Sequence, residues 1–115
     1  MITRFKSNDR VSQAIRYGEF FETAGQVAAD TAAGIADQTQ QVLAAIDDLL
    51  SSLDVTKREL TRVQIWLADM SHFAEMNVVY ERWLAGYPKP VRACVESRLA
   101  TREYLVEIQA FGFTG

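Results

Sequence analysis

The chain has 115 residues, of which 49% are hydrophobic and 23% charged, and this matches the size and composition of one soluble globular domain rather than a disordered or fibrous protein. Its net charge of -3 provides no broad positive field, so we expect neither a nucleic acid nor an anionic membrane as partner. No apolar run approaches the length of a membrane span, and the charged N-terminus lacks the apolar core of a signal peptide, so we expect a cytoplasmic protein.

Few residues in the chain are suited to metal or thiol chemistry. Cys94 is the only cysteine, which excludes an intramolecular disulfide or a thiolate metal cluster within one chain. It is either a reactive thiol or a small packed residue, and reactivity would require an electropositive, accessible setting. His72 has no second histidine to join and is expected to be exposed. Asp47 and Asp48 are adjacent, so they cannot share one helical face and are expected to be solvated. No metal site is predicted.

The first part of the chain has the pattern of short strands joined by turns. A strand is predicted at ITRF (2–5), followed by a polar turn. The segments VSQAIRY (11–17) and FFETAGQ (20–26) flank Gly18 and Glu19 and predict a β-hairpin.

The strongest helical pattern begins at Ile35. Apolar residues recur at helical spacing as far as Leu53. The side predicted to face water carries Asp37, Gln38, Gln41, Asp47 and Asp48. After this helix, TKRE (56–59) has the form of a capping box, and the alternating apolar residues of segment 63–67 predict a strand.

A second helix is predicted after Ser71, which is a good N-cap. Its apolar stripe contains Phe73, Met76, Asn77, Tyr80, Trp83 and Leu84. An amide on such a stripe needs a partner, so Asn77 is expected either to make a structural hydrogen bond or to contact a ligand. Trp83 is expected to be buried. Glycine and prolines in segment 86–90 end the helix.

Two strands, 91–98 and 103–111, complete the order βββαβαββ. Both helices need an apolar surface to cover, and alternate strand residues supply it: Val91, Ala93, Val95, Val106, Ile108 and Ala110. The prediction is therefore a single α+β domain over residues 1–115, a two-layer sandwich with both helices packed on one face of a mixed sheet.

The same alternation places Arg92 and Cys94 on the face turned away from the helices, together with Glu107 on the last strand. If Arg98 pairs with Glu103 across a hairpin, Cys94 falls opposite Glu107 and Arg92 becomes its diagonal neighbour. An arginine fork can bind a carboxylate in bidentate fashion, and a nearby carboxylate can hold or deprotonate a water. The alternative is an ordinary salt bridge that closes an interface.

This predicted face also carries Trp66, Leu105 and Phe111, which makes it too apolar to be left in water. We expect another subunit to cover it. Trp66 is open to either ligand stacking or interface packing.

Several ordered motifs resemble the Rid (reactive intermediate deaminase) family, also called RidA/YjgF. The C-terminal part carries a Pro-x-Arg-x-Cys-Val segment (90–95) before a Val-Glu-Ile segment (106–108). The same family order is followed by SQAI (12–15), AGQ (24–26) and VQIWLADMSHFAEMN (63–77), so the resemblance spans nearly the whole chain.

The resemblance implies a homotrimer of chorismate-mutase-like α+β subunits with ligand clefts between subunits. It implies hydrolysis of 2-aminoacrylate and 2-iminopropionate to 2-keto acids and ammonia, without metal or organic cofactor. Carried over by motif, Arg92 would bind the substrate carboxylate and Glu107 would activate the attacking water. The backbone at Cys94 would contact the substrate nitrogen, the backbone at Gly25 would approach the ligand, and Asn77 would lie near the cleft.

Two departures from the family pattern affect these expectations. Val11 and Ala24 stand where many members have cleft hydroxyl residues. The connection VAADTAAG (27–34) is also shorter than the usual loop, so the chain resembles a shorter, divergent subgroup that keeps the arginine. Two further hypotheses follow: a non-catalytic trimer that binds small carboxylates or 2-keto acids with a regulatory or protective role, and a purely structural trimer in which a protein salt bridge occupies Arg92.

Overall fold

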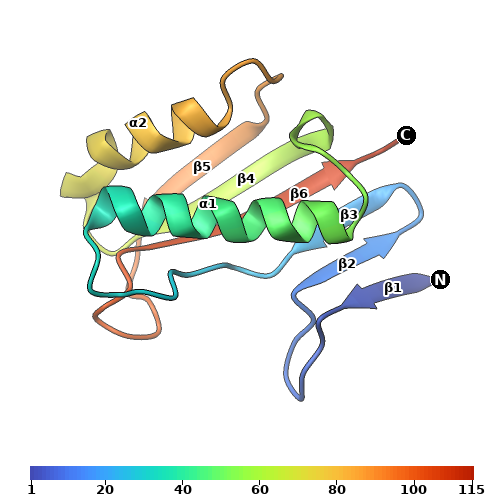
Figure 1. Ribbon diagram of the computed structural model, residues 1–115, viewed down its shortest axis with the longest axis horizontal. Coiled ribbons are helices and arrows are strands. Elements are labelled where there is room, and N and C mark those ends of the chain that lie inside the picture. Colours follow the sequence, from blue (N-terminus) through green and yellow to red (C-terminus); the bar gives the residue numbers. More distant parts are fainter.

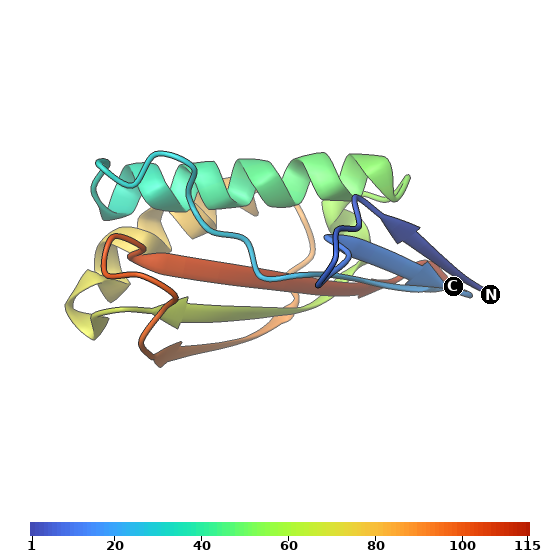
Figure 2. The same ribbon diagram turned by 90° about the horizontal axis from the view of Figure 1, so that it is seen from below.

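Both helices lie on one face of a single six-stranded sheet, and the other face is bare (Figures 1 and 2). The computed structural model describes residues 1–115. Its elements are β1 (Ile2–Phe5), β2 (Ala14–Tyr17), β3 (Phe20–Thr23), α1 (Ile35–Ser52), β4 (Leu60–Leu67), α2 (Phe73–Trp83), β5 (Val91–Glu96) and β6 (Val106–Phe113), with short 3-10 turns η1 (Lys57–Glu59) and η2 (Met70–His72). The predicted two-layer α+β fold and element order are confirmed.

The order of strands in the sheet differs from the prediction. It is β1-β2-β3-β6-β4-β5, so β4 separates β5 from β6 and the expected hairpin between the last two strands is wrong. Because α2 carries the chain back along the sheet, β5 pairs with β4 in parallel, and β6 pairs with the other side of β4 in antiparallel fashion. The connecting segment 97–105 passes the end of β4, where the Ser97 amide donates to Leu67 and the Ala68 amide donates to Leu105.

The orientation of β5 is also the reverse of the prediction. Arg92 pairs with Val63 and Cys94 with Ile65, and the two β4 residues are fully buried under the helices. Residues paired in this way point to the same face, so Arg92 and Cys94 face the helices. Val91 and Val95 point to the bare face and are 68% and 44% exposed. The side chains of a strand alternate between the two faces of the sheet, but this alternation does not show which set faces the helices. In an edge strand such as β5, either set can do so.

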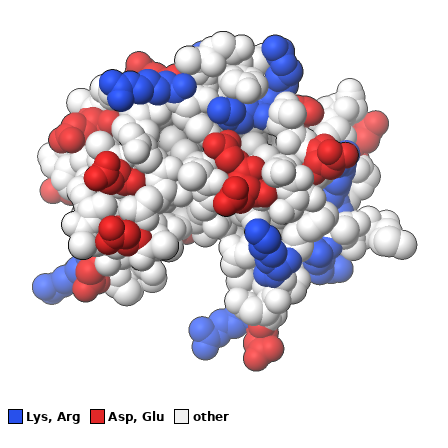
Figure 3. All heavy atoms as spheres, in the orientation of Figure 1, with Lys and Arg blue, Asp and Glu red and all other residues white.

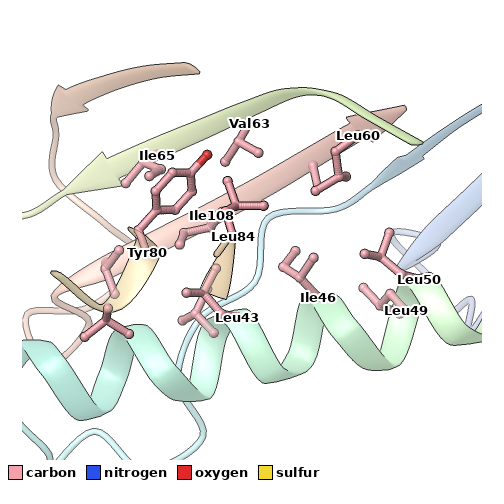
Figure 4. Close-up of a cluster of buried hydrophobic side chains, with 14 of the residues drawn as sticks. Leu43, Ile46, Leu49, Leu50, Leu60, Val63, Ile65, Tyr80, Leu84 and Ile108 are labelled. Atoms are coloured by element: carbon pink, nitrogen blue, oxygen red, sulfur yellow. The ribbon is translucent and has the colours of Figure 1, made fainter. Parts of the chain in front are cut away.

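The core lies between the helices and the two central strands (Figure 4). Leu43, Ile46 and Leu50 of α1 point toward the sheet, where Ile65 of β4 and Ile108 of β6 are fully buried. Burying side chains of this size contributes about 1.5–3 kcal/mol each, which fixes the helical layer on this face. The prediction that Val106, Ile108 and Ala110 face the helices is confirmed.

One polar residue belongs to this core although a water-facing position was predicted for it. Gln38 is fully buried; its Nε2 donates to the carbonyl of Glu103 at 2.9 Å, and its Oε1 accepts from the amide of Leu105 at 3.0 Å. The same Nε2 also donates to Thr31 and Ala33 carbonyls. This side chain therefore ties the segment before β6 to α1, and its partners lie too far along the chain for helical periodicity to reveal them.

The start of α2 differs from the prediction as well. The N-cap of α2 is His72, not Ser71, and it makes no side-chain cap hydrogen bond. Asp69 caps the preceding turn η2, where its carboxylate accepts from the Ser71 amide at 2.9 Å. That hydrogen bond lowers the pKa of Asp69. His72 is half-buried instead of exposed, because the η2 turn folds it in, and its Nδ1 is buried. The predicted capping box at Thr56 and Glu59 is confirmed. Neither α1 nor α2 combines the length and apolar character needed to cross a membrane.

Candidate functional site

The structure separates the predicted site residues into two groups. Arg92, Cys94 and Asn77 lie on the helix side, at the β5 edge of the sheet, and are called here the arginine group. Gly25 and Glu107 meet on the bare face, called here the open face, and form the glutamate group. The expectation that Arg92 and Glu107 are neighbours on one face of one chain is therefore wrong.

Arg92 is held against α2 by neutral partners. Its Nη1 donates to Asn77 Oδ1 at 2.6 Å, which confirms that the Asn77 amide has a structural hydrogen bond. The guanidinium also lies over the rings of Tyr80, at 4.9 Å from the centroid, and Phe73, at 5.6 Å. Neither an amide nor an aromatic face neutralises the arginine, so its charge stays available to an anion at this edge of the sheet.

Cys94 follows Arg92 along the same side of β5 and is half-buried. Burial raises the pKa of the Cys94 thiol, while the nearby Arg92 charge partly opposes that rise. A thiol with a raised pKa stays protonated at neutral pH and is a weak nucleophile. This favours the packed residue over the reactive thiol among the two alternatives for Cys94.

Glu107 lies on the open face of β6, opposite Trp66 of β4. The backbone of Gly25 packs directly against its carboxylate: a Cβ built on Gly25 would overlap the carboxylate oxygen and lie 2.8 Å from its Cδ. No other amino acid fits here without displacing Glu107. Burial raises the pKa of this carboxyl group, which makes its carboxylate a better proton acceptor than an exposed glutamate.

Two glutamines hold the segment that carries Gly25. Gln26 exchanges backbone hydrogen bonds with Ile108, at 2.8 and 3.1 Å, and so bridges this segment to β6. The Gln26 side chain donates to Gln13 Oε1 at 2.8 Å. Neither glutamine was a predicted site residue, although both belong to the motifs SQAI and AGQ. Their hydrogen bonds hold the loop beside Glu107 in place.

A hollow of about 200 Å³ lies beside the glutamate group, lined by Ser12, Ile15, Glu22, Thr23, Ala24 and Gln109. The largest cavity, about 460 Å³, is elsewhere, in the loop around Arg98, Arg102 and Tyr104, and contains none of the predicted site residues. Cavity size therefore does not identify this site, because a single chain leaves the two groups open to solvent on either side of the sheet.

The open face around Glu107 carries many apolar side chains. Trp66 and Phe111 are half-buried there, and the guanidinium of Arg62 stacks on the Phe111 ring at 4.0 Å from its centroid. Further exposed members of this face are Ile2, Tyr17, Phe20, Val91, Val95 and Phe113. A face with this many exposed apolar side chains is typical of an interaction face.

Comparison with known proteins gives a consistent result over the full chain. A family model described as Endoribonuclease L-PSP matches residues 1–113. A RutC family protein from Haemophilus ducreyi is 37% identical, with 94% of this chain and 92% of that protein covered. A RutC family protein from Pyrococcus horikoshii is 37% identical, with 89% and 85% covered.

The similarity extends to solved structures. A YjgF family member from Neisseria meningitidis has a TM-score of 0.93 at 36% identity, covering 100% of this chain and 96% of that chain. An uncharacterized protein from Pseudomonas aeruginosa has a TM-score of 0.92 at 31% identity, covering 100% of both chains.

Proposed function

The chain belongs to the Rid/YjgF family, and on this premise we propose that it hydrolyses small reactive 2-imino acids, of the 2-aminoacrylate and 2-iminopropionate type, to 2-keto acids and ammonia. The observation that carries this proposal is the placement of an uncompensated arginine and a half-buried carboxylate at motif positions of that family. Together they supply an anchor for a small anion and a base for water.

We propose further that each reaction site forms between two copies of the chain in a homotrimer. Arg92 and Glu107 lie on opposite sides of one sheet, so they cannot both reach one small ligand within a single chain. A second copy placed against the open face can bring its own β5 edge, with Arg92, to Glu107. A head-to-tail contact of this kind closes into a ring when the rotation is suitable.

The chemistry needs only these groups. Arg92 of one copy holds the substrate carboxylate, and the carboxylate of Glu107 from the next copy takes a proton as water attacks the imine carbon. The protonated Glu107 then returns that proton to the nitrogen, which gives a carbinolamine. The carboxylate next takes the proton of the new hydroxyl group and passes it to the amino nitrogen, the carbon–nitrogen bond breaks as the carbonyl forms, and ammonia and the 2-keto acid leave. The backbone at Cys94 contacts the nitrogen end. Orientation of a water toward a carbon that is already electrophilic supplies most of the rate gain.

The test generates 2-iminopropionate in place with an amino-acid oxidase and compares its removal with the buffer rate. We expect the parent to exceed buffer, and Arg92→Ala and Glu107→Gln each to lose at least about 100-fold in kcat/KM. Removal by the parent that only equals the buffer rate over several imino acids contradicts the enzyme.

Mixing the two inactive variants tests the location of the site. Arg92→Ala and Glu107→Gln chains, refolded together, place an intact Arg92 beside an intact Glu107 in about a quarter of the clefts of a random ring. We therefore expect about that share of parental activity to return. No recovery, in mixed rings shown to form, contradicts a site shared between copies.

The second candidate is a binder of small carboxylates or 2-keto acids without turnover. It is favoured by Val11 and Ala24, which place no hydroxyl where many family members have one. In that case no imine is removed, but 2-oxobutyrate raises the Tm of the parent and not that of Arg92→Ala.

RNA cleavage, which the family name Endoribonuclease L-PSP suggests, has little support from the charge of the chain. The net charge is -3, and Figure 3 shows Lys and Arg side chains interspersed with Asp and Glu over the helix-covered face. An RNA incubation at matched protein concentration therefore serves as the negative arm of the assay.

A further inference from the structure

Arg92 is held by three side chains of α2, and none of them carries a charge: Asn77 accepts its hydrogen bond, and Tyr80 and Phe73 present their ring faces. We propose that these three residues form a neutral clamp, which positions Arg92 to bind a carboxylate while leaving its positive charge uncompensated. The identity of the ligand rests on the proposed function, whereas the clamp itself rests on the contacts of Arg92.

The clamp is built on one stripe of a helix. Phe73, Asn77 and Tyr80 stand at positions i, i+4 and i+7, which lie on one face of α2. The pairing of Arg92 with Val63 directs its side chain toward that stripe. Tyr80 is only 7% exposed and belongs to the buried cluster, where Figure 4 shows its ring between α2 and β4. The guanidinium therefore rests on a surface that the core itself holds in place.

A neutral partner and a charged partner would have different consequences for binding. A carboxylate at position 77 would hold Arg92 more tightly but would compete with a ligand for the same charge. The Asn77 oxygen occupies only the Nη1 end of the guanidinium, and ring faces attract the cation without using an N–H donor. The other N–H groups of Arg92 remain available for a bidentate contact with a carboxylate.

Holding the side chain in advance also favours binding. A free arginine loses rotamer freedom when it grips a ligand, and a pre-positioned one has less freedom left to lose. In this chain the stacking on Tyr80 and Phe73 restricts the guanidinium before any ligand arrives. The three clamp residues are thus positioning residues, and among these four side chains only Arg92 contacts the ligand.

Asn77→Asp is the sharpest test, because the side chain keeps its shape and gains a charge. We expect affinity for 2-oxobutyrate, measured by calorimetry on the full chain, to fall about 10- to 100-fold, while the Tm stays equal or rises. A merely structural role predicts that a stronger hydrogen bond to Arg92 leaves binding intact. Ala74→Asp adds the same charge at an exposed position of α2 and is expected to bind like the parent.

Substitution of Tyr80 tests the stacking. Tyr80→Phe keeps the ring, so we expect parental binding. Tyr80→Leu removes the ring face, and we expect affinity to fall and KM to rise about 3- to 30-fold, with kcat changed by less than about twofold. A Tyr80→Leu variant that lowers kcat at constant KM would show that the ring does not act through Arg92.

The outcomes separate the clamp from the reaction. If the parent turns over an imine and Asn77→Asp has the same KM, the clamp is wrong and the proposed function stands. If the parent binds 2-oxobutyrate without turnover and Asn77→Asp loses that binding, the clamp stands and the reaction is wrong. If neither turnover nor binding occurs in the parent, both are wrong.

Discussion

The backbone of Gly25 and the carboxylate of Glu107 are packed in direct contact, so that no side chain fits at position 25 without displacing the carboxylate. We expect Gly25→Ala to lower kcat/KM by at least about 10-fold, because the carboxylate must turn away, and to change the free energy of unfolding by less than about 1 kcal/mol, because only the end of a flexible side chain has to move. Enzyme kinetics and urea unfolding measure the two effects. Gly34→Ala is the matched control, because a Cβ at Gly34 meets nothing within 4 Å.

Burial of Glu107 predicts a pH dependence of stability. The folded-state pKa is raised above the ordinary value of 4.5, so the folded state holds this proton more tightly than the unfolded state. The contribution of Glu107 to stability is therefore fully present below pH 4.5 and is lost as pH rises through its folded-state pKa. We expect Glu107→Gln to raise the Tm relative to the parent at pH 7, and this gain to shrink toward pH 4. A gain independent of pH would contradict the assignment.

Lys57 links the turn η1 to the C-terminal end of α2. Its Nζ donates to the Trp83 carbonyl at 2.7 Å and lies 5.1 Å and 4.6 Å from the ring centroids of Trp83 and Tyr87. Lys57→Met loses a helix-terminus charge and two cation–π contacts, and we expect it to lower the free energy of unfolding by about 1–3 kcal/mol. Urea unfolding followed by tryptophan fluorescence measures this change. Arg102 is exposed and makes neither kind of contact, so Arg102→Met should change stability by less than about 0.5 kcal/mol.

Gln38 makes the buried link between α1 and the segment before β6. Gln38→Leu keeps the volume but leaves the Leu105 amide and the Glu103 carbonyl without their partner, so we expect a loss of about 2–4 kcal/mol. Gln40→Leu, at an exposed position of the same helix, should change stability by less than about 0.5 kcal/mol. If denaturant titrations gave similar losses for the two variants, the loss of stability would come from replacing any glutamine of this helix by leucine, not from the buried hydrogen bonds of Gln38.

The hydrophobic periodicity and the order of the motifs in the sequence were sufficient to predict the helices and strands, the two-layer arrangement and the family. α1 was predicted from Ile35 because apolar residues recur along one stripe, and the alternation in segments 63–67 and 106–110 is that of strands with one buried face. These signals are local, since each depends on residues within a few turns or a few strand positions of one another.

Only the tertiary structure decided which strands are neighbours and which way β5 faces. Alternation is symmetric, so it assigns Arg92 and Val91 to opposite faces without saying which face the helices cover. That choice is made by the return of the chain through α2 and by the packing of Tyr80 and Phe73 against the arginine. The separation of Arg92 from Glu107, and the burial of Gln38 against residues far along the chain, arise from long-range contacts that no local pattern records.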